Sequence, residues 1–280
     1  MRKFKMLAAA MLLIAGVMGA TSVQAVSYTL SSDNSSAQLD PNSQSGLYSW
    51  KIDGNDILSQ QWFWYRVGPT GGENSIDTIG TPTVTQPNSG TVLLGYTSSS
   101  FQIDVNYTLQ GGPLHSGSAS MGDFVTITNL TSSPLDFHFF EYSDYGLSNN
   151  PKSDTGNYSY IPSAPSAPLA GVITQKGNWG AMVMNLGVPL PSHWKIAYYG
   201  SLLDQLNSGN PTTLSDSSNA LSPGDITWAL EWDLSIPANS LAYITNLQLV
   251  TGVPEPGILL LLGSGLIGAL VVRKRFGKNA

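Results

Sequence analysis

Cysteine is absent from all 280 residues of the chain. Its absence excludes disulfide bonds, thiolate ligands for a metal ion and a cysteine nucleophile. A domain of this size can bury enough apolar surface to be stable without cross-links. We therefore expect a fold that is held together by its hydrophobic core.

Basic residues are scarce in the central part of the chain. Residues 26–252 contain seventeen acidic residues and five basic ones, with a formal net charge of −12. The five basic residues are Lys51, Arg66, Lys152, Lys176 and Lys195. Because binding to a phosphate backbone needs clustered Lys and Arg, this charge argues against nucleic acid and anionic lipid as partners.

Sequence patterns that mark common catalytic sites are also missing. There is no G-x-S-x-G turn, phosphate-binding loop or dinucleotide-binding fingerprint. His115, His138 and His193 are far apart, with no His-x-His or His-x-x-x-His spacing. The sequence therefore predicts no metal site of the zinc type and no cofactor.

Two pairs of acidic residues remain as candidates for chemistry. Glu231 and Asp233 lie two apart on a predicted strand, and such a pair could serve a glycosidase. They alternate with apolar residues such as Trp232, so we expect them on the solvent face of that strand. Glu141 and Asp144 could contribute to a calcium site at a strand end, but the D-x-D-x-D-G spacing is absent. We expect the protein not to be an enzyme.

The N-terminus has the three parts of a secretory signal peptide. A basic MRKFK segment precedes an apolar run over residues 6–20, and Val23-Gln24-Ala25 offers the small residues that signal peptidase recognises. We expect cleavage between Ala25 and Val26, so residues 1–25 would be removed. The alternative is an uncleaved N-terminal anchor.

The C-terminus, residues 253–280, has a second tripartite pattern. Pro254, Glu255 and Pro256 precede an uncharged apolar run over residues 257–272, and a basic cluster of Arg273, Lys274 and Arg275 follows. The run has the composition of a short single membrane span, and basic flanks are retained in the cytoplasm. The prolines prevent a helix from extending upstream, which predicts an exposed, extended neck before the span.

This order of Pro-Glu-Pro, apolar run and basic tail resembles the PEP-CTERM sorting signal of Gram-negative bacteria. The resemblance implies that an exosortase recognises and processes the tail while the apolar span holds the chain in the inner membrane. It also implies delivery to the cell envelope, the surface or the extracellular matrix. An ordinary single-span anchor without processing is the alternative.

The region between the two signals, residues 26–252, shows period-two alternation almost throughout. The two clearest cases are FQIDVNYTL, beginning at Phe101, and ITWALEWDLSI, beginning at Ile226, and both predict half-buried antiparallel strands. Weaker strand patterns occur at residues 28–31, 47–52, 62–67, 91–97, 124–129, 135–142, 172–175, 181–186, 194–199 and 241–250.

Two segments depart from this alternation. SLLDQLNSG predicts a short helix with Ser201 as its N-cap and Gly209 as its end. Residues 146–169, rich in Ser, Asn and Pro, predict either a surface loop or the rim of a binding face. We therefore predict one all-β domain, an antiparallel β-sandwich of jelly-roll-like topology with one short helix.

The aromatic stretch QWFWYRVG, at residues 61–68, is the most unusual part of the predicted domain. Because side chains alternate across a strand, Trp62 and Trp64 are expected on one face and Tyr65 on the other. Exposed rings of Trp62, Trp64 and Tyr65 would form a platform for sugar rings. The alternative is an aromatic core.

These observations favour an exported surface or matrix protein with a structural or adhesive role. Its expected partners are signal peptidase, the exosortase and the membrane. The second hypothesis is a carbohydrate-binding module for exopolysaccharide that uses the aromatic stretch, and the third is a hydrolase. Fold alone does not choose among them.

Overall fold

The computed structural model describes residues 27–147, 153–163, 167–177, 182–218 and 223–252. The predicted signal peptide with its Ala25–Val26 cleavage site lies outside the described residues. So does the predicted sorting signal at residues 253–280. Within the described ranges, no helix has both the length and the apolar character needed to span a membrane.

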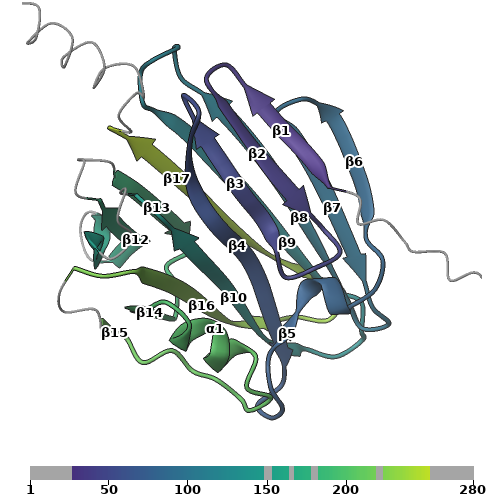
Figure 1. Cartoon of the computed structure of the whole chain (residues 1–280). Helices are drawn as coiled ribbons and strands as arrows, with labels where there is room; N and C mark the ends of the chain where they lie inside the picture. The colour runs from purple at the N-terminus through teal and green to yellow at the C-terminus, as the bar shows by residue number, and fades with distance from the viewer. Residues whose placement is uncertain (1–26, 148–152, 164–166, 178–181, 219–222, 253–280) are drawn as a thin grey trace, which may run out of the picture.

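The strands form two sheets that pack as two layers (Figure 1). The order in the nine-stranded sheet is β1-β2-β3-β4-β10-β16-β14-β15, and β5 pairs with β4. Its strands are β1 (Tyr28–Ser32), β2 (Ser35–Asp40), β3 (Gly46–Ile52), β4 (Asn55–Val67), β5 (Asn74–Ser75), β10 (Leu135–Tyr145), β14 (His193–Tyr198), β15 (Ser217–Ser218) and β16 (Ile226–Ile236).

The second sheet has eight strands in the order β11-β12-β13-β17-β9-β8-β7-β6. Its strands are β6 (Thr83–Asn88), β7 (Thr91–Thr97), β8 (Phe101–Gly111), β9 (Ala119–Asn129), β11 (Thr155–Ser163), β12 (Ala167–Lys176), β13 (Met182–Val188) and β17 (Leu241–Thr251). The described strand pairs are antiparallel except β14 with β15. The prediction of an all-β antiparallel sandwich is therefore confirmed.

The strand order differs from the predicted jelly-roll-like topology. Strands β1 to β4 lie side by side in the order in which they follow one another along the chain, and so do strands β6 to β9. These runs are successive hairpins, and the two sheets together exceed the eight strands of a jelly roll. The alternation in the sequence indicates half-buried strands, but it does not specify how they connect.

The main core lies between the sheets, and its residues come from the predicted alternation. In β8, Phe101, Ile103, Val105, Tyr107 and Leu109 are buried, and the intervening residues are more exposed. Burial of apolar side chains contributes about 1.5–3 kcal/mol for each large residue. The core therefore supplies the stability that disulfides provide in many small exported domains.

A second buried layer covers part of the outer face of the nine-stranded sheet. The helix α1 (Ser201–Leu206) packs over β14 and β16, and its Leu202 and Leu206 are fully buried. The short 3-10 helix η1 (Ile76–Thr78) follows β5, and its Ile76 is buried. Leu214, in the segment after α1, is also buried. This layer determines the environment of several candidate site residues.

The predicted helix is confirmed, but its N-cap is not the predicted one. Gly200, with φ of 90°, occupies the N-cap position, and Ser201 is the first helical residue. No side chain caps the helix. A glycine accepts this positive φ without steric cost, so the chain turns from β14 into α1 one residue earlier than Ser201.

The predicted irregular segment at residues 146–169 contains a strand that the sequence pattern did not show. Strand β11 pairs with β12 and lies at the edge of the eight-stranded sheet. A register irregularity falls at Ile161/Pro162, as is typical of proline in an edge strand. Pairing with β12 supplies the backbone hydrogen bonds of β11 along one side. This pairing outweighs the weak local preference of the segment for a strand.

Candidate functional site

The aromatic stretch does not form an exposed platform in the structure. Trp62 and Trp64 are both fully buried on β4. The Trp62 indole donates to Ser75 Oγ at 3.0 Å, and the Trp64 indole donates to Asn207 Oδ1 at 3.1 Å. The second buried layer, which contains η1 and α1, covers this face of the sheet, and the local sequence could not indicate that cover.

Tyr65 points to the other face of β4, toward the main core. Its ring stacks on Phe137 at 5.9 Å between centroids and contacts Phe101 at 5.1 Å. In the aromatic stretch at residues 61–68, Trp62, Trp64 and Tyr65 therefore belong to the aromatic core, which was the alternative interpretation. The sugar-platform interpretation requires exposed rings, and these three do not provide them.

The predicted calcium pair, Glu141 and Asp144, is divided between the two faces of β10. Glu141 is fully buried between the sheets and accepts from Gln61 and Gln248, each at 3.2 Å. Residues three apart on a strand point in opposite directions. Asp144 instead lies near Asp154 and Asp225, and burial, with their negative charges, raises its pKa to about 7.

Between the sheets, a second carboxyl group lies close to Glu141. Asp123 is buried, and its Oδ2 accepts from Gln61 Nε2 at 2.9 Å. Tyr107 donates to Gln61 Oε1 at 2.9 Å, so one glutamine links three polar side chains. Burial raises the pKa of Asp123 to about 7, although hydrogen bonds from Gln61 and Asn246 lower it. The side chains named in this network are all buried, and we assign it a structural role.

The acidic pair Glu231 and Asp233 has a different environment from the predicted solvent face. The two share one face of β16, as expected, but Glu231 is fully buried while Asp233 is partly exposed. Leu214 N donates to Glu231 Oε2 at 2.7 Å. The segment after α1 therefore covers Glu231, and the period-two pattern could not reveal a cover from a distant segment.

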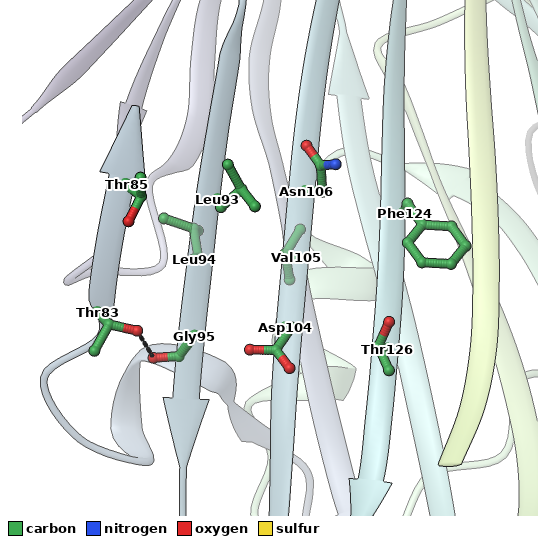
Figure 2. A pocket seen from close by; sticks show the side chains of 10 residues that line it. All are labelled: Thr83, Thr85, Leu93, Leu94, Gly95, Asp104, Val105, Asn106, Phe124 and Thr126. Carbon is green, nitrogen blue, oxygen red and sulfur yellow. Dashed lines mark hydrogen bonds between the residues drawn. The ribbon is translucent and has the colours of Figure 1, made fainter. Parts of the chain in front are cut away.

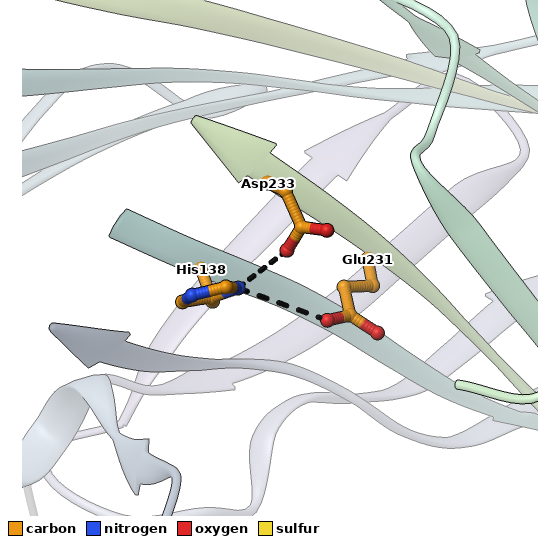
Figure 3. A group of neighbouring side chains, drawn as sticks. All are labelled: His138, Glu231 and Asp233. Atoms are coloured by element: carbon orange, nitrogen blue, oxygen red, sulfur yellow. Dashed lines mark hydrogen bonds and ion pairs between the residues drawn. The ribbon is translucent and has the colours of Figure 1, made fainter. Parts of the chain in front are cut away.

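Two of the three scattered histidines lie beside this acidic pair. His138 is directly opposite Asp233 across the β10–β16 ladder, and His193 is opposite Glu231 across the β14–β16 ladder. Figure 3 shows His138 on β10 directed toward both carboxylates of β16. We call His138, His193, Glu231 and Asp233 the histidine–carboxylate cluster. His115 lies elsewhere, in the turn between β8 and β9.

Charges within the histidine–carboxylate cluster alter its protonation. Burial raises the pKa of Glu231 to about 7, with a smaller rise from Asp233, and the Leu214 hydrogen bond opposes this. Burial lowers the pKa of His193, but its hydrogen bond to Asp216 and the nearby carboxylates outweigh that effect and raise it above 6.5. Both shifts favour the protonated forms of these two groups, and the nitrogen and oxygen atoms of the site are the ligand types that bind divalent metals.

The sequence analysis missed this cluster because none of its spacings is local. His138, His193 and Glu231 come from three strands, and only the pairing of β10, β16 and β14 makes them neighbours. The one local signal was the two-residue spacing of Glu231 and Asp233, which correctly indicated a shared face.

A second candidate site lies on the outer face of the eight-stranded sheet. A shallow hollow of about 280 Å³ is lined by residues of β6, β7, β8 and β9 (Figure 2). Its lining residues are Thr83, Thr85, Leu93, Leu94, Gly95, Asp104, Val105, Asn106, Phe124 and Thr126. Asp104 is held by Gln102 Nε2, at 2.8 Å from each of its oxygens.

Exposed aromatic and aliphatic side chains continue this face onto β17. Phe124 and Tyr243 stack with ring centroids 5.4 Å apart at an angle of 29°, and they are 40% and 51% exposed. Leu247 and Leu249 on β17 are also exposed. Exposed apolar side chains that gather on one face of a protein often mark a binding surface. The sequence analysis did not single out Phe124 or Tyr243, because their exposure depends on which face of the sheet remains uncovered.

Comparison with known families identifies the C-terminal segment. Residues 252–275 match the family model described as the PEP-CTERM protein-sorting motif. The predicted resemblance is therefore confirmed for this segment. The motif indicates an exported protein that is sorted through the membrane by an exosortase. The individual roles predicted for Pro254, Glu255, Pro256 and the basic residues 273–275 stay predictions.

Comparison with solved structures concerns the described domain. The chain is similar to a putative aldose 1-epimerase from Escherichia coli K12, with 8% identity, a TM-score of 0.50, and coverage of 81% of this chain and 99% of that one. It is also similar to a galactose mutarotase-like protein from Lactobacillus casei, with 10% identity, a TM-score of 0.46, and coverage of 80% and 100%. A third similar structure is an aldose epimerase homologue from C. elegans, with 8% identity, a TM-score of 0.47, and coverage of 81% and 99%. No curated protein sequence matches this chain. At these identities the likeness to the Escherichia coli protein shows a shared fold and no more.

Proposed function

We propose that this exosortase-sorted protein has an adhesive role and binds a neutral polysaccharide on the outer face of its eight-stranded sheet. The observation that carries the proposal is the exposed, stacked pair of Phe124 and Tyr243 beside the hollow in Figure 2. The apolar face of a sugar ring packs on an aromatic ring, while its hydroxyl groups need hydrogen-bond partners. Asp104, Asn106 and the lining threonines supply such partners.

The charge of the protein favours a neutral ligand. The region between the two signals carries a formal net charge of −12, and Asp104 is the one acidic residue among those that line the hollow. An acidic polysaccharide would be repelled by this field. A neutral chain laid across the sheet would meet rings, hydroxyls and amides, with little electrostatic cost.

We propose binding without cleavage at this face. Glycoside hydrolysis commonly uses two carboxyl groups on either side of the scissile bond. The residues that line the hollow include a single carboxyl group, that of Asp104. The surface is also shallow, which suits adhesion along a polymer better than enclosure of one sugar.

The test is retention of the full-length protein, purified in detergent, on an insoluble neutral glucan and on exopolysaccharide from the native host. Phe124→Ala and Tyr243→Ala should each weaken retention about tenfold, which is roughly 1.4 kcal/mol. Both side chains are exposed, so the folded state should lose less than about 1 kcal/mol. Tyr199→Ala, which removes an exposed tyrosine from the turn between β14 and α1, is the matched control. Equal retention by all three variants and the wild type would contradict the proposal.

A further inference from the structure

The histidine–carboxylate cluster is distinct from the proposed polysaccharide face and lies on the other sheet. Its members converge because strand pairing aligns them. His138 faces Asp233 across one ladder, and Glu231 lies two residues from Asp233 on the same strand. Side chains in these positions share one face of a sheet. The ligand atoms of His138, Glu231 and Asp233 all lie within 4.8 Å of one another.

The individual contacts leave one oxygen directed into the centre of this group. His138 Nδ1 contacts Asp233 Oδ1 and lies 3.9 Å from Glu231 Oε1. Glu231 Oε1 is buried and has no hydrogen-bond partner among the residues that the structure describes. A buried carboxylate oxygen without a partner is costly, and a bound cation would remove that cost.

His193 supplies a fourth donor that is already oriented. Its Nδ1 lies 2.8 Å from Asp216 Oδ2, and Asp216 is itself fixed by a hydrogen bond of 3.0 Å from Trp194 N. This leaves His193 Nε2 toward the cluster, 3.6 Å from Asp233 Oδ2. Metal-binding histidines commonly have their second ring nitrogen held by a carboxylate in this way.

The side chains of the cluster differ in solvent exposure, and the more exposed ones give an ion access to the buried Glu231. The Glu231 side chain is 0% exposed, whereas those of His193 and Asp233 are 30% and 38% exposed. A metal could therefore enter from the Asp233 side and retain a water molecule there. Once a metal displaces their protons, two imidazoles and two carboxylates also carry the charge that balances a divalent cation.

The basic side chains of Arg66 and Lys195 on this face are engaged elsewhere, and Lys195 Nζ donates to Gln205 Oε1 at 2.9 Å. Arg66 is opposite His138 across the β4–β10 ladder. Its guanidinium donates to Glu73, to Gly68 O and to Thr212 O. The positive charge is thus neutralised by Glu73 and does not occupy the cluster.

We propose that His138, Glu231 and Asp233 bind a divalent transition-metal ion, with His193 as the fourth ligand. Mixed imidazole and carboxylate ligands without thiolate suit Zn²⁺. Ligand atoms about 2.1 Å from a tetrahedral zinc lie roughly 3.4 Å apart. The 3.9 Å between His138 Nδ1 and Glu231 Oε1 and the 3.6 Å between His193 Nε2 and Asp233 Oδ2 are close to this spacing, whereas the His138–Asp233 contact would have to open to admit an ion. The site is the one metal site that the geometry of the described residues supports.

The experiment measures metal binding by the full-length protein, purified without a polyhistidine tag and stripped with EDTA. Titration with Zn²⁺ by calorimetry should show one ion per chain, and mass spectrometry of the metal content should confirm the ratio. Titration with Co²⁺ should produce the visible absorption bands of a four-coordinate nitrogen–oxygen site. Absence of stoichiometric binding of both ions would overturn the proposal.

Variants locate the site. His138→Ala, Glu231→Gln and Asp233→Asn should each weaken Zn²⁺ binding at least tenfold and reduce the Co²⁺ absorption. Glu231→Gln keeps an oxygen that can accept from Leu214 N, and Asp233 is partly exposed, so folding should survive both changes. His115→Asn is the control for adventitious imidazole binding, since asparagine tolerates the positive φ of 66° at this position.

A folding check makes each outcome decisive. In EDTA, the melting temperatures of Asp233→Asn and the wild type should be similar, and Zn²⁺ should raise that of the wild type alone. If Glu231→Gln fails to fold, Asp233→Asn and His193→Asn decide the matter. Wild-type affinity in both of these variants, or loss of the ion in His115→Asn, would overturn the proposal.

Discussion

Arg66 and Glu73 form a buried ion pair with 3.1 Å between Nε and Oε1, and their side chains are 4% and 0% exposed. The same Glu73 oxygen accepts from Thr212 N at 2.7 Å, while Arg66 donates to Thr212 O at 3.2 Å. The pair therefore ties strand β4 to the segment after α1. That segment is the one that covers Glu231, so the ion pair supports the histidine–carboxylate cluster from a distance.

Breaking this pair should be strongly destabilising. Glu73→Gln leaves the Arg66 charge buried without its counter-charge, which should lower the free energy of unfolding by about 3–5 kcal/mol. Urea denaturation of the full-length protein is the measurement. Asp204→Asn, an exposed change on α1, should stay within about 0.5 kcal/mol. The double variant Arg66→Met, Glu73→Leu should lose less free energy of unfolding than the single variants Arg66→Met and Glu73→Leu lose together. Strictly additive losses would show that the two residues are not coupled.

Truncation of the aromatic stretch should affect stability and leave polysaccharide binding intact. Trp62 is fully buried, contacts Phe63 and Tyr96, and donates to Ser75. Trp62→Ala should therefore cost about 3–5 kcal/mol, seen as a lower thermal midpoint. Tyr160→Ala, which changes an exposed aromatic residue, should cost little. A Trp62→Ala protein with normal stability and lost glycan retention would restore the sugar-platform hypothesis.

Stability should depend on pH through Asp123. Burial raises the pKa of Asp123 from 3.8 to about 7, so the folded state holds a proton that the unfolded state releases above pH 4. The stability that protonated Asp123 contributes to the folded state is fully present below about pH 4 and is lost as the pH rises through 7. The full difference is on the order of a few kcal/mol.

Chemical denaturation at pH 4, 5.5 and 8 tests this dependence. Asp123→Asn cannot ionise but retains an oxygen for the Gln61 amide. The wild type should lose stability relative to this variant as pH rises from 4 to 8. An identical pH profile for the two proteins would show that Asp123 does not titrate in this range.

Replacement of Pro254, Glu255 and Pro256 by alanine should block processing of the C-terminal tail. The residues belong to the segment that matches the sorting motif, and alanine lacks both the fixed φ and the missing backbone N–H of proline. The expected result in the native host is accumulation of the unprocessed membrane form, seen as a higher mass on immunoblots. Conservative replacement of Lys278 by Arg is the control. Processed protein of unchanged mass would show that the triplet is not recognised.

Local sequence determined the fold class and the sorting motif of the protein. Alternation of apolar and polar residues depends on neighbours along the chain alone, so β8 and β16 could be predicted as strands with defined faces. The sorting motif is likewise a contiguous stretch, so it can be recognised from the order of residues along the chain alone. Weak local preference, as in the edge strand β11, was insufficient because pairing with β12 decides that segment.

The candidate sites were decided by tertiary structure. Glu231 and Asp233 share a face by local geometry, but strand pairing places His138 and His193 beside them, and the segment after α1 buries Glu231. Burial of Trp62 and exposure of Phe124 likewise depend on which sheet face receives a cover. Period-two alternation distinguishes the two faces of a strand, but it cannot specify what a distant part of the chain places on them, because that depends on packing between segments.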